Sequence, residues 1–342
     1  MKQNNREVNS KVQPFSILAG DVGATKTLVG LFTTAGTRPA PVIVSTFATR
    51  DFQNLTTLLA SFYGGLPATD VRVGAACFGL AGPVTGQTAT LTNLAWHADA
   101  AAVASTFQIP RVSLLNDLHA MALAAPLLDP EELWVLQEGT PNPDGNLALI
   151  AAGTGLGEAM LHRIDGRLVA VPSEAGHADF AARNEREIEV LRALMARFGR
   201  VEVERVLSGP GLANLHRTTH RGRCHVVEDI DDPHAPGLIS KAAMDRACQG
   251  CIDALDLFVD AYGAEAGNLA LRSLATAGLF IGGGIGAKIL PALASGRFLR
   301  AFLDKPPMSD LLARVPVKVI VNTEAGLLGA AVGAAQLLDT PH

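Results

Sequence analysis

The chain has 342 residues and a formal net charge of −5, with 48% hydrophobic and 18% charged residues. This length and composition allow two domains, each with its own core. The net negative charge and the lack of a run of Lys and Arg residues argue against nucleic acid as a partner. The apolar run Leu327–Val332 is too short to span a bilayer. Residues 1–13 are polar and lack the apolar stretch of a signal peptide, so we expect a disordered tail and a soluble, cytoplasmic protein.

The first apolar stretch, LAGDVGATKTLVG, nearly matches a P-loop. Gly20 and Lys26-Thr27 fit that pattern, but Thr25 replaces its second glycine and a strand-like segment, not a helix, follows. The sequence therefore predicts strand Phe15–Ala19, a tight turn and a returning strand to Thr34. Backbone N–H groups of such a turn can bind phosphate, and Asp21 could hold Mg²⁺ through water. The alternative is an ordinary hairpin with a buried Asp. The phosphate interpretation assigns nucleotide binding to Gly20, Asp21, Val22, Gly23, Ala24 and Thr25.

Strands and helices then alternate in the first half of the chain. The patterns predict strands at Pro41–Phe47, Val71–Phe78 and Arg111–Leu115 and helices at Leu55–Tyr63 and Ala98–Phe107. This order implies a mixed sheet with helices packed against it. The small residues of Gly79–Val84 allow other groups to approach the backbone closely.

The second half, from about Trp134, repeats the opening design. A strand at Leu147–Ala152 leads into the turn Gly153-Thr154-Gly155-Leu156-Gly157 and a returning strand. Asn184 with Glu187 predicts a capped helix start. Further predicted elements are a long helix from about Ser240 that breaks near Gly263, another helix from Ala264, strands at Ala277–Ile281 and Val317–Val321, and a final helix at Gly326–Leu338.

Two glycine patterns resemble dinucleotide-binding fingerprints. The turn at Gly153–Gly157 is followed by a strand, which a dinucleotide fold does not place there. Gly282-Gly283-Gly284-Ile285-Gly286-Ala287 does match G-x-G-x-x-A after a strand. A dinucleotide fold needs several more strand–helix units than the remaining residues supply. We therefore do not expect NAD binding.

Candidate polar residues follow strands or turns. Asn116-Asp117 stands where a strand ends and a helix begins, either as a helix cap or as a catalytic carboxylate that faces a cleft. Glu174 and His177 have i, i+3 spacing, but no second E-x-x-H exists to complete a di-iron site. Glu204 by itself is typical of a solvated helix residue.

Cysteine and histidine spacing gives a weak metal signal. Cys248 and Cys251 form C-Q-G-C in a helical-looking stretch without a second Cys pair, so we expect all four cysteines, which include Cys77 and Cys224, to be structural. The histidines at 216, 220, 225 and 234 lie among Arg, Asp and Pro. We expect an exposed connection there, with a metal site as the alternative.

Two strand–turn–strand units and a third Gly-rich turn are together typical of the actin-like ATPase (ribonuclease H-like) fold. That α/β fold has two domains with mixed sheets flanked by helices and a cleft between the domains. From about Ile17 to Leu338 the chain also resembles the bacterial glucokinase family. The segments that carry the resemblance are GDVGATKT, LLNDLHAMA, AAGTGLGEA, PSEAGHADF, ERVLSGPGLANLH and FIGGGIGAKIL. ERVLSGPG after EAGHADF is the specific part, because actin and the chaperones of this fold lack it.

The resemblance implies an enzyme that transfers the γ-phosphoryl group of ATP, with Mg²⁺, to the 6-hydroxyl of glucose. It implies Asp117 as catalytic base and a small domain of residues 14–117 plus 327–342 beside a large domain of residues 118–326, with no membrane partner and often a homodimer. No Cys-rich zinc loop follows His177, so the chain resembles the zinc-free branch. The implied sugar contacts are Asn116, Asp117, Glu174, His177 and Glu204, and the implied nucleotide contacts in the later turns are Gly153, Thr154, Gly155, Gly283 and Gly284.

Some positions depart from the family pattern. Ala24 and Ala175 replace glycines, which puts a methyl group where a turn could require positive φ, and Lys26 adds a charge near the phosphates. Alternatives to a glucokinase are a kinase for another hexose or with another phosphoryl donor, and a non-catalytic sugar-sensing protein on the same fold. An actin-like polymerising ATPase would not need Glu174, His177 and Glu204 together.

Overall fold

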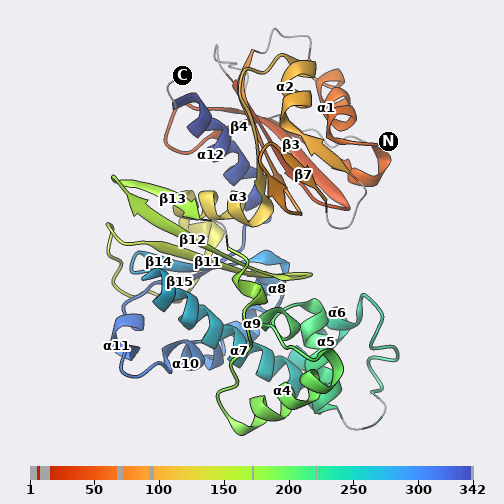
Figure 1. Cartoon of the computed structure of the whole chain (residues 1–342), viewed down its shortest axis with the longest axis vertical. Helices are drawn as coiled ribbons and strands as arrows, with labels where there is room; N and C mark the ends of the chain where they lie inside the picture. Colours follow the sequence, from red (N-terminus) through yellow and green to blue (C-terminus); the bar gives the residue numbers. More distant parts are fainter. Residues whose placement is uncertain are drawn as a thin grey trace. The chain divides into compact units, whose positions relative to one another are not determined.

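The computed structural model describes residues 6–7, 16–67, 72–91, 96–171, 173–220, 222 and 224–339. The chain divides into two compact units, residues 1–129 with 322–342 and residues 130–321 (Figure 1). The sequence placed this boundary after Asp117, whereas the structure places it after Asp129 because helix α3 (Asp117–Ala124) packs on the last helix, α12 (Ala325–Asp339). Of the expected tail 1–13, only Arg6–Glu7 is described, as strand β1; the rest lies outside the described residues.

A six-stranded mixed sheet forms the centre of the first unit, in the order β1-β4-β3-β2-β5-β9. The strands β2, β3 and β4 form an antiparallel meander, and β5 and β9 lie parallel to β2. The predicted hairpin at the start of the chain is confirmed. The bounds are β2 Ser16–Val22, β3 Lys26–Thr33, β4 Ala40–Ala48, β5 Val73–Leu80 and β9 Val112–Asn116.

Apolar residues cover both faces of this sheet, because alternate residues of a strand point to opposite sides. Leu18 and Val22 of β2 pack into one core with helices α1 and α2, whereas Ile17 and Ala19 pack against α12. Figure 1 shows α1 and α2 on one side of the sheet and α12 on the other. The remaining elements of the unit are α1 Leu55–Gly64, α2 Ala100–Phe107, the 3₁₀ turns η1 Thr49–Asp51 and η2 Ala125–Leu127, and a small sheet of β6 Val84–Thr85, β7 Thr88–Thr90 and β8 His97–Asp99.

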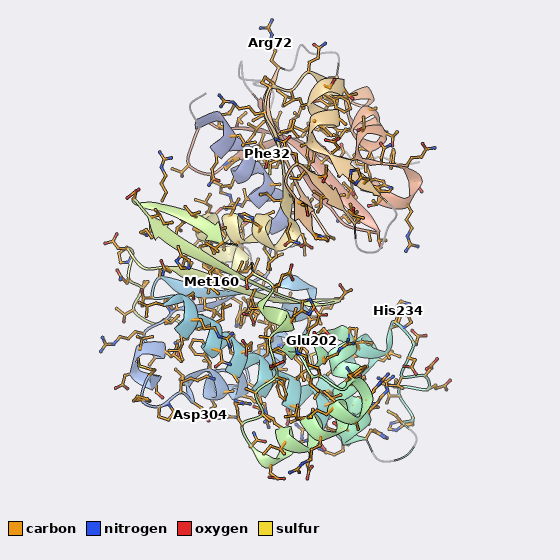
Figure 2. All side chains as sticks on the ribbon, viewed as in Figure 1. Phe32, Arg72, Met160, Glu202, His234 and Asp304 are labelled. Carbon is orange, nitrogen blue, oxygen red and sulfur yellow. The ribbon has the colours of Figure 1, made fainter. Side chains whose placement is uncertain are left out.

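The last helix approaches its neighbours through glycines. A side-chain carbon on Gly329 would lie 1.6 Å from the carbonyl oxygen of Ala120 in α3, and one on Gly333 would lie 3.0 Å from the Cys77 sulfur in β5. Phe32 of β3 belongs to the core that α12 covers (Figure 2). The close approach fixes α3, and therefore Asp117 at its first position, against the helix that returns from the far end of the sequence.

The second unit has its own mixed sheet, in the order β10-β15-β14-β11-β12-β13, with β11, β14 and β15 parallel. The strand β11 returns as β12, which confirms the second predicted strand–turn–strand unit. The bounds are β10 Leu133–Gln137, β11 Leu147–Ala152, β12 Leu156–Ile164, β13 Arg167–Val171, β14 Gly278–Gly282 and β15 Val317–Ile320.

The long helix α7 (Gln249–Ser273) packs on β11 and β12 in the large core of this unit. The predicted break near Gly263 is wrong, since α7 continues through it. A side chain at Gly263 would lie 2.2 Å from the Phe298 carbonyl oxygen, so the glycine serves a close helix crossing and not a helix end. The other helices are η3 Pro130–Glu132, η4 Ala175–His177, α4 Glu185–Phe198, η5 Val203–Arg205, α5 Gly209–Thr219, α6 Ala235–Met244, α8 Gly283–Lys288, α9 Leu290–Leu293, α10 Arg297–Leu303 and α11 Ser309–Leu312.

Within the described part of the chain, no helix is both long and apolar enough to cross a membrane. The mixed sheets with helices packed on them agree with the α/β class expected from the sequence.

Candidate active site

Two carboxylates lie close together at one edge of the first unit's sheet. Asp21 is near the end of β2 and pairs in register with Gly79 of β5, while Asp117 follows directly on β9. Gly79 stands between them, since a side-chain carbon there would lie 3.7 Å from the Asp117 Cα atom and 3.9 Å from the Gly20 carbonyl oxygen. The parallel strands β2, β5 and β9 therefore bring together two acidic residues that are far apart in the sequence.

Asn116 caps helix α3 and is held by backbone groups at both ends of its amide. Its Oδ1 atom accepts a hydrogen bond from the Leu118 N–H at 3.0 Å, and its Nδ2 atom donates to the Gly82 carbonyl oxygen at 3.2 Å. The same Leu118 N–H donates to Asp117 Oδ1 at 2.8 Å. These bonds fix both side chains at the start of α3, so the helix-cap interpretation of Asn116 is correct whatever its further role.

The first turn is closed by its own backbone and by Thr49. The Gly23 N–H donates to the Lys26 carbonyl oxygen at 3.1 Å. Thr49, which is fully buried, donates its hydroxyl to the Gly23 carbonyl at 2.7 Å and its N–H to the Thr25 carbonyl at 3.0 Å. Among the described residues, no partner is seen for the N–H groups of Ala24 and Thr25. Those two groups, and not the N–H of Gly23, can bind an anion.

The surroundings of the other residues predicted to bind the nucleotide in the first hairpin limit what each can contribute. Gly20 cannot carry a side chain, because a Cβ atom would lie 2.6 Å from the Phe78 ring. Val22 is buried in the core, so it offers the site only backbone atoms. Ala24 does not have positive φ, and neither does Ala175. The expectation that these alanines replace glycines that need a left-handed backbone is therefore wrong, and both turns accommodate a methyl group without backbone strain.

The second turn has the same design in the second unit. The Gly153 N–H donates to the Gly155 carbonyl oxygen at 2.8 Å, which leaves the N–H groups of Thr154 and Gly155 without a partner among the described residues. Glu204 supports this turn directly: its Oε2 atom accepts from the Leu156 N–H at 2.8 Å. A side chain at Gly155 would lie 2.5 Å from that oxygen. Glu204 is therefore a neighbour of the turn and not a solvated helix residue.

Glu174 and His177 lie on the adjoining segment. Glu174 precedes the 3₁₀ turn η4, and both side chains are exposed. Gly176 lies against β12, since a side chain there would be 2.2 Å from the Leu156 carbonyl oxygen. His177 Nδ1 lies 3.2 Å from Glu202 Oε2, and ligand atoms of His177, Glu202 and Glu204 lie within 4.8 Å of one another. Pro172, at the start of this predicted segment, lies outside the described residues.

The third Gly-rich turn reaches the same edge of the second sheet. Strands β11 and β14 are parallel, with Ala151 opposite Gly282. Gly283 has φ +80°, and a side-chain carbon there would lie 2.5 Å from the Ala152 carbonyl oxygen. Gly284 follows within α8, and a Cβ atom there would meet open space. The predicted nucleotide contacts at Gly153–Gly155 and at Gly283–Gly284 are thus neighbours in space.

Known proteins resemble this chain over nearly its whole length. The glucokinase family model matches residues 18–337. Glucokinases from Nostoc sp. and Synechocystis sp. are 39% and 36% identical to the chain over 94% of its length and over 99% and 98% of theirs. The crystal structure of a glucokinase from an Antarctic psychrotroph has a TM-score of 0.84 and 30% identity, and the match covers 94% of this chain and 99% of that one.

The chain belongs to the glucokinase family. The family resemblance, the sugar-kinase fold and the enzyme class, a hexose phosphotransferase, are thereby confirmed as the sequence predicted.

Burial dominates the electrostatics of the acidic pair in this glucokinase-family chain. Burial and then the nearby Asp117 charge raise the pKa of Asp21 to about 6, against the opposing effect of Lys26. Burial also raises the pKa of Asp117, while hydrogen bonds from the Leu118 N–H and its own N–H oppose the rise. Two carboxylates that repel each other in a partly dehydrated site are suited to bind a cation.

Two residues that the sequence did not single out contact predicted site residues of this glucokinase-family chain. Glu202 pairs with His177, with Arg205 at 3.3 Å and with Arg200 at 3.9 Å, and its place in the second unit is seen in Figure 2. Thr49 closes the first turn from a separate 3₁₀ turn. Neither residue stands in a recognisable motif, and only tertiary pairing brings them to the site.

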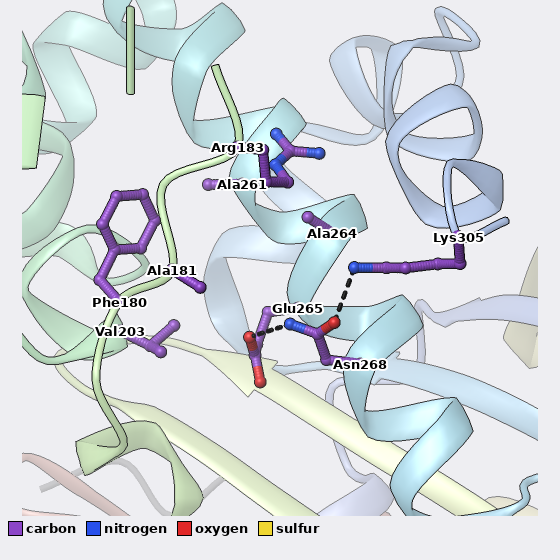
Figure 3. A pocket seen from close by; sticks show the side chains of 9 residues that line it. All are labelled: Phe180, Ala181, Arg183, Val203, Ala261, Ala264, Glu265, Asn268 and Lys305. Carbon is purple, nitrogen blue, oxygen red and sulfur yellow. Dashed lines mark hydrogen bonds between the residues drawn. The ribbon is translucent and has the colours of Figure 1, made fainter. Parts of the chain in front are cut away.

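A cavity of about 80 Å³ in the second unit does not belong to the predicted site (Figure 3). Its polar lining is already paired: Asn268 donates to Glu265 at 2.8 Å and accepts from Lys305 at 2.6 Å. Glu158 of β12 is fully buried, and its carboxyl group faces that of Glu265 in the interior. Burial, and then the Glu265 charge, raise the pKa of Glu158 from 4.5 to about 8.

We expect Glu158 to make the chain less stable as pH rises from about 4.5 to about 8. The native state keeps a proton that the unfolded state releases in this window, so the free energy of unfolding falls with pH. Glu158→Gln removes this dependence and should stabilise the protein by at least about 1 kcal/mol at pH 8, and much less at pH 5. Urea unfolding at both pH values measures the difference. The exposed Glu185→Gln is the control, and an equal shift at both pH values would contradict the assignment.

Proposed function

We propose that this chain transfers the γ-phosphoryl group of ATP to the 6-hydroxyl of glucose. The observation that carries the proposal is the meeting of Asp21 and Asp117 beside a turn whose Ala24 and Thr25 N–H groups point to no partner within the described chain. Phosphoryl transfer needs alignment and charge stabilisation more than covalent chemistry from the protein. A carboxylate at a helix start beside a phosphate-binding turn meets this need.

Asp117 is the proposed base. It orients the 6-hydroxyl toward the γ-phosphorus and accepts its proton late, when the forming O–P bond has made that proton acidic. Asn116 positions this carboxylate through the shared Leu118 N–H. Its proposed contact with the sugar uses the second N–H of Nδ2 or the second lone pair of Oδ1, because each end of the amide makes one backbone bond.

Mg²⁺ is the proposed cofactor, and the acidic pair fits it. Carboxylate oxygens and water are the ligands that Mg²⁺ prefers, and Asp21 supplies a carboxylate whose charge its surroundings disfavour. Asp21 would hold the ion through water. When bound, Mg²⁺ neutralises charge on the phosphate oxygens.

The two turns are the proposed phosphate-binding elements, through the N–H groups of Ala24, Thr25, Thr154 and Gly155. The third turn, at Gly283 and Gly284, is the proposed neighbour of the adenosine. Gly284 is the better placed of the two, because Gly283 is committed to close packing on Ala152.

Glu174, His177 and Glu204 are the proposed ligands of the sugar hydroxyls. A carboxylate can accept hydrogen bonds from two vicinal hydroxyls, and a sugar that lacks one leaves a charge unpaired. Glu204 retains one oxygen for this purpose, because the other accepts from the Leu156 N–H. The pairing of His177 with Glu202 holds the imidazole in one orientation.

A coupled assay tests the proposal. Purified protein is assayed with ATP-Mg²⁺ against glucose, mannose, fructose and glucosamine, and then with glucose against other phosphoryl donors. We expect the highest kcat/KM with glucose and ATP. A higher kcat/KM with another hexose or donor would reassign the substrate, and glucose binding without turnover for any pair would favour a sugar sensor.

Glu174→Gln should raise the KM for glucose by roughly tenfold or more, because a hydrogen bond to a charged acceptor contributes about 1.5–3 kcal/mol. The KM for ATP should change little. Initial rates over a glucose series measure both. Glu189→Gln, on an exposed part of α4, is the matched control. An unchanged KM for glucose in the Glu174 variant would remove this residue from the sugar site.

We further propose, from the family resemblance, a cytoplasmic homodimer. Light scattering on the purified chain measures its mass in solution.

A further inference from the structure

Cys248 and Cys251 stand at a helix start and not inside a helix. Cys248 is the N-cap of α7 with an extended backbone (φ −147°), and Cys251 is in its first turn. The Cys248 sulfur accepts a hydrogen bond from the Cys251 N–H. The sequence placed this C-x-x-C pair within a helix, whereas Cys248 precedes the helix and has an extended backbone. In this position the sulfurs of Cys248 and Cys251 lie close together.

A third cysteine and a histidine reach the same point from another loop. Cys224 follows α5, and its sulfur lies 3.9 Å from that of Cys248 in the buried interior. His220 is the C-cap of α5, and its ring contacts the Cys248 thiol. Ligand atoms of Cys224, Cys248 and Cys251 lie within 4.8 Å of one another, as do those of His216, His220 and Cys224.

The spacing fits a metal centre and not a disulfide. Sulfurs bound to one tetrahedral zinc ion at about 2.3 Å lie about 3.8 Å apart, which is close to the observed 3.9 Å. A disulfide requires about 2.05 Å. The Cys248 thiol has side-chain contacts with Cys251, with Cys224 and with His220, so one cysteine touches all three other groups.

We propose that His220, Cys224, Cys248 and Cys251 bind one zinc ion. Three thiolates and one imidazole form a closed Cys₃His set, which is typical of structural zinc. The ion joins the end of α5, the loop that carries Cys224 and the start of α7. None of these four residues belongs to the sugar or nucleotide motifs, so the proposal is independent of the proposed reaction.

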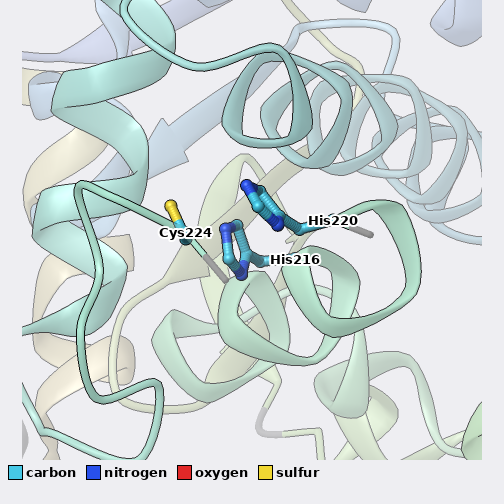
Figure 4. A group of neighbouring side chains, drawn as sticks. All are labelled: His216, His220 and Cys224. Carbon is cyan, nitrogen blue, oxygen red and sulfur yellow. The ribbon is translucent and has the colours of Figure 1, made fainter. Parts of the chain in front are cut away.

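The contacts of the His220 ring support its assignment as the imidazole ligand. His220 Nδ1 lies 3.2 Å from the Gly222 carbonyl oxygen, and donation there leaves Nε2 with the lone pair that a metal needs. His216 stacks on the His220 ring with centroids 4.9 Å apart (Figure 4). Its Nε2 atom is buried and has no hydrogen-bond partner among the described residues. His216 therefore positions the His220 ring by stacking, and its ligand nitrogen lies within 4.8 Å of the Cys224 sulfur.

Metal analysis of the full chain tests the site. The protein is purified without chelator from cells supplemented with zinc, and its metal content is measured by elemental mass spectrometry. We expect about one zinc ion per chain. Cys248→Ser with Cys251→Ser should carry less than about a tenth of that. Cys77→Ala, which removes a buried cysteine outside the cluster, should retain the full content. A zinc content below about one tenth in the wild-type chain after incubation with Zn²⁺, with four titratable thiols, would overturn the proposal.

Two further measurements test the site even if the double variant does not fold. The first is thiol modification of the wild-type chain, and the second is the Co²⁺ spectrum of the wild-type chain and of two His variants. Stepwise thiol modification with a mercurial should release the zinc as about three thiols react, and release without thiol modification would contradict cysteine ligation. Co²⁺ exchanged into the site should show thiolate charge-transfer and tetrahedral d–d absorption. His220→Ala should shift that spectrum and weaken Co²⁺ binding about tenfold or more, whereas His216→Ala should keep the spectrum. The reverse pattern would remove His220 from the ligand set.

Discussion

Replacement of Asp117 by Ala should lower kcat by about 10²–10⁴-fold, the usual contribution of a general base. The carboxylate that we propose as the base stands at the first position of α3 and is held by the Leu118 N–H. KM values for glucose and ATP should change much less than kcat, because the proton is transferred only in the transition state. Steady-state kinetics with both substrates varied measures the two effects separately.

Two further variants and the pH dependence of kcat/KM test the role of Asp117 more specifically. Asp117→Asn keeps the size of the side chain and should be nearly as inactive as the alanine variant. Asp99→Asn changes another helix-start aspartate of the same unit, the N-cap of α2, and should leave kcat unchanged. Burial raises the pKa of Asp117, and the base must be ionised to act. As the pH is lowered, kcat/KM of the wild type should therefore begin to fall while the pH is still above the ordinary range of carboxylate pKa values. Near-normal turnover in Asp117→Asn would refute this role.

Gly329→Ala should destabilise the first unit by about 3 kcal/mol or more, at the upper end of overpacking effects. The added methyl group would lie 1.6 Å from the Ala120 carbonyl oxygen, a backbone atom that cannot rotate away. Either α12 or α3 must move. Since α3 begins with Asp117, we expect a fall in kcat/KM beyond the loss of folded protein.

Gly333→Ala is the matched control on the same helix. Its methyl group would meet the Cys77 sulfur at 3.0 Å, a contact that a small shift relieves. The gain in helix propensity, about 1 kcal/mol, opposes that cost, so this variant should stay within about 1 kcal/mol of wild type. Denaturant unfolding monitored by circular dichroism measures both variants. Equal stability of the two would show that the approach of α12 to α3 is looser than described.

The sequence predicted most of the features that local patterns encode. Both hairpins, the strand that ends at Asn116 and the helix that begins at Asp117 follow from apolar periodicity and turn residues. The clustering of Gly153 and Gly283 depends on the parallel pairing of β11 and β14, which local periodicity does not encode.

The remaining features depend on contacts between distant segments. Gly263 was expected to end a helix because glycine disfavours one, yet a carbonyl from α10 requires it. His216 was expected to be exposed because polar residues surround it in sequence, but α5 turns it inward. Thr49 and Glu202 act through partners that only the folded chain brings near.

The division of the first unit between the two ends of the sequence has a consequence for synthesis. Residues 130–321 form a contiguous unit that can fold as soon as it has left the ribosome. The first unit cannot, because Leu327, Ala330 and Ala334 complete the core on Ile17 and Ala19, and Arg111 bonds to the carbonyl oxygens of Leu337 and Leu338. Until α12 has been synthesised, the face of the sheet that carries Ile17 and Ala19 lacks its apolar cover. The nascent chain should therefore need chaperone protection at its amino-terminal end, although that end is made first.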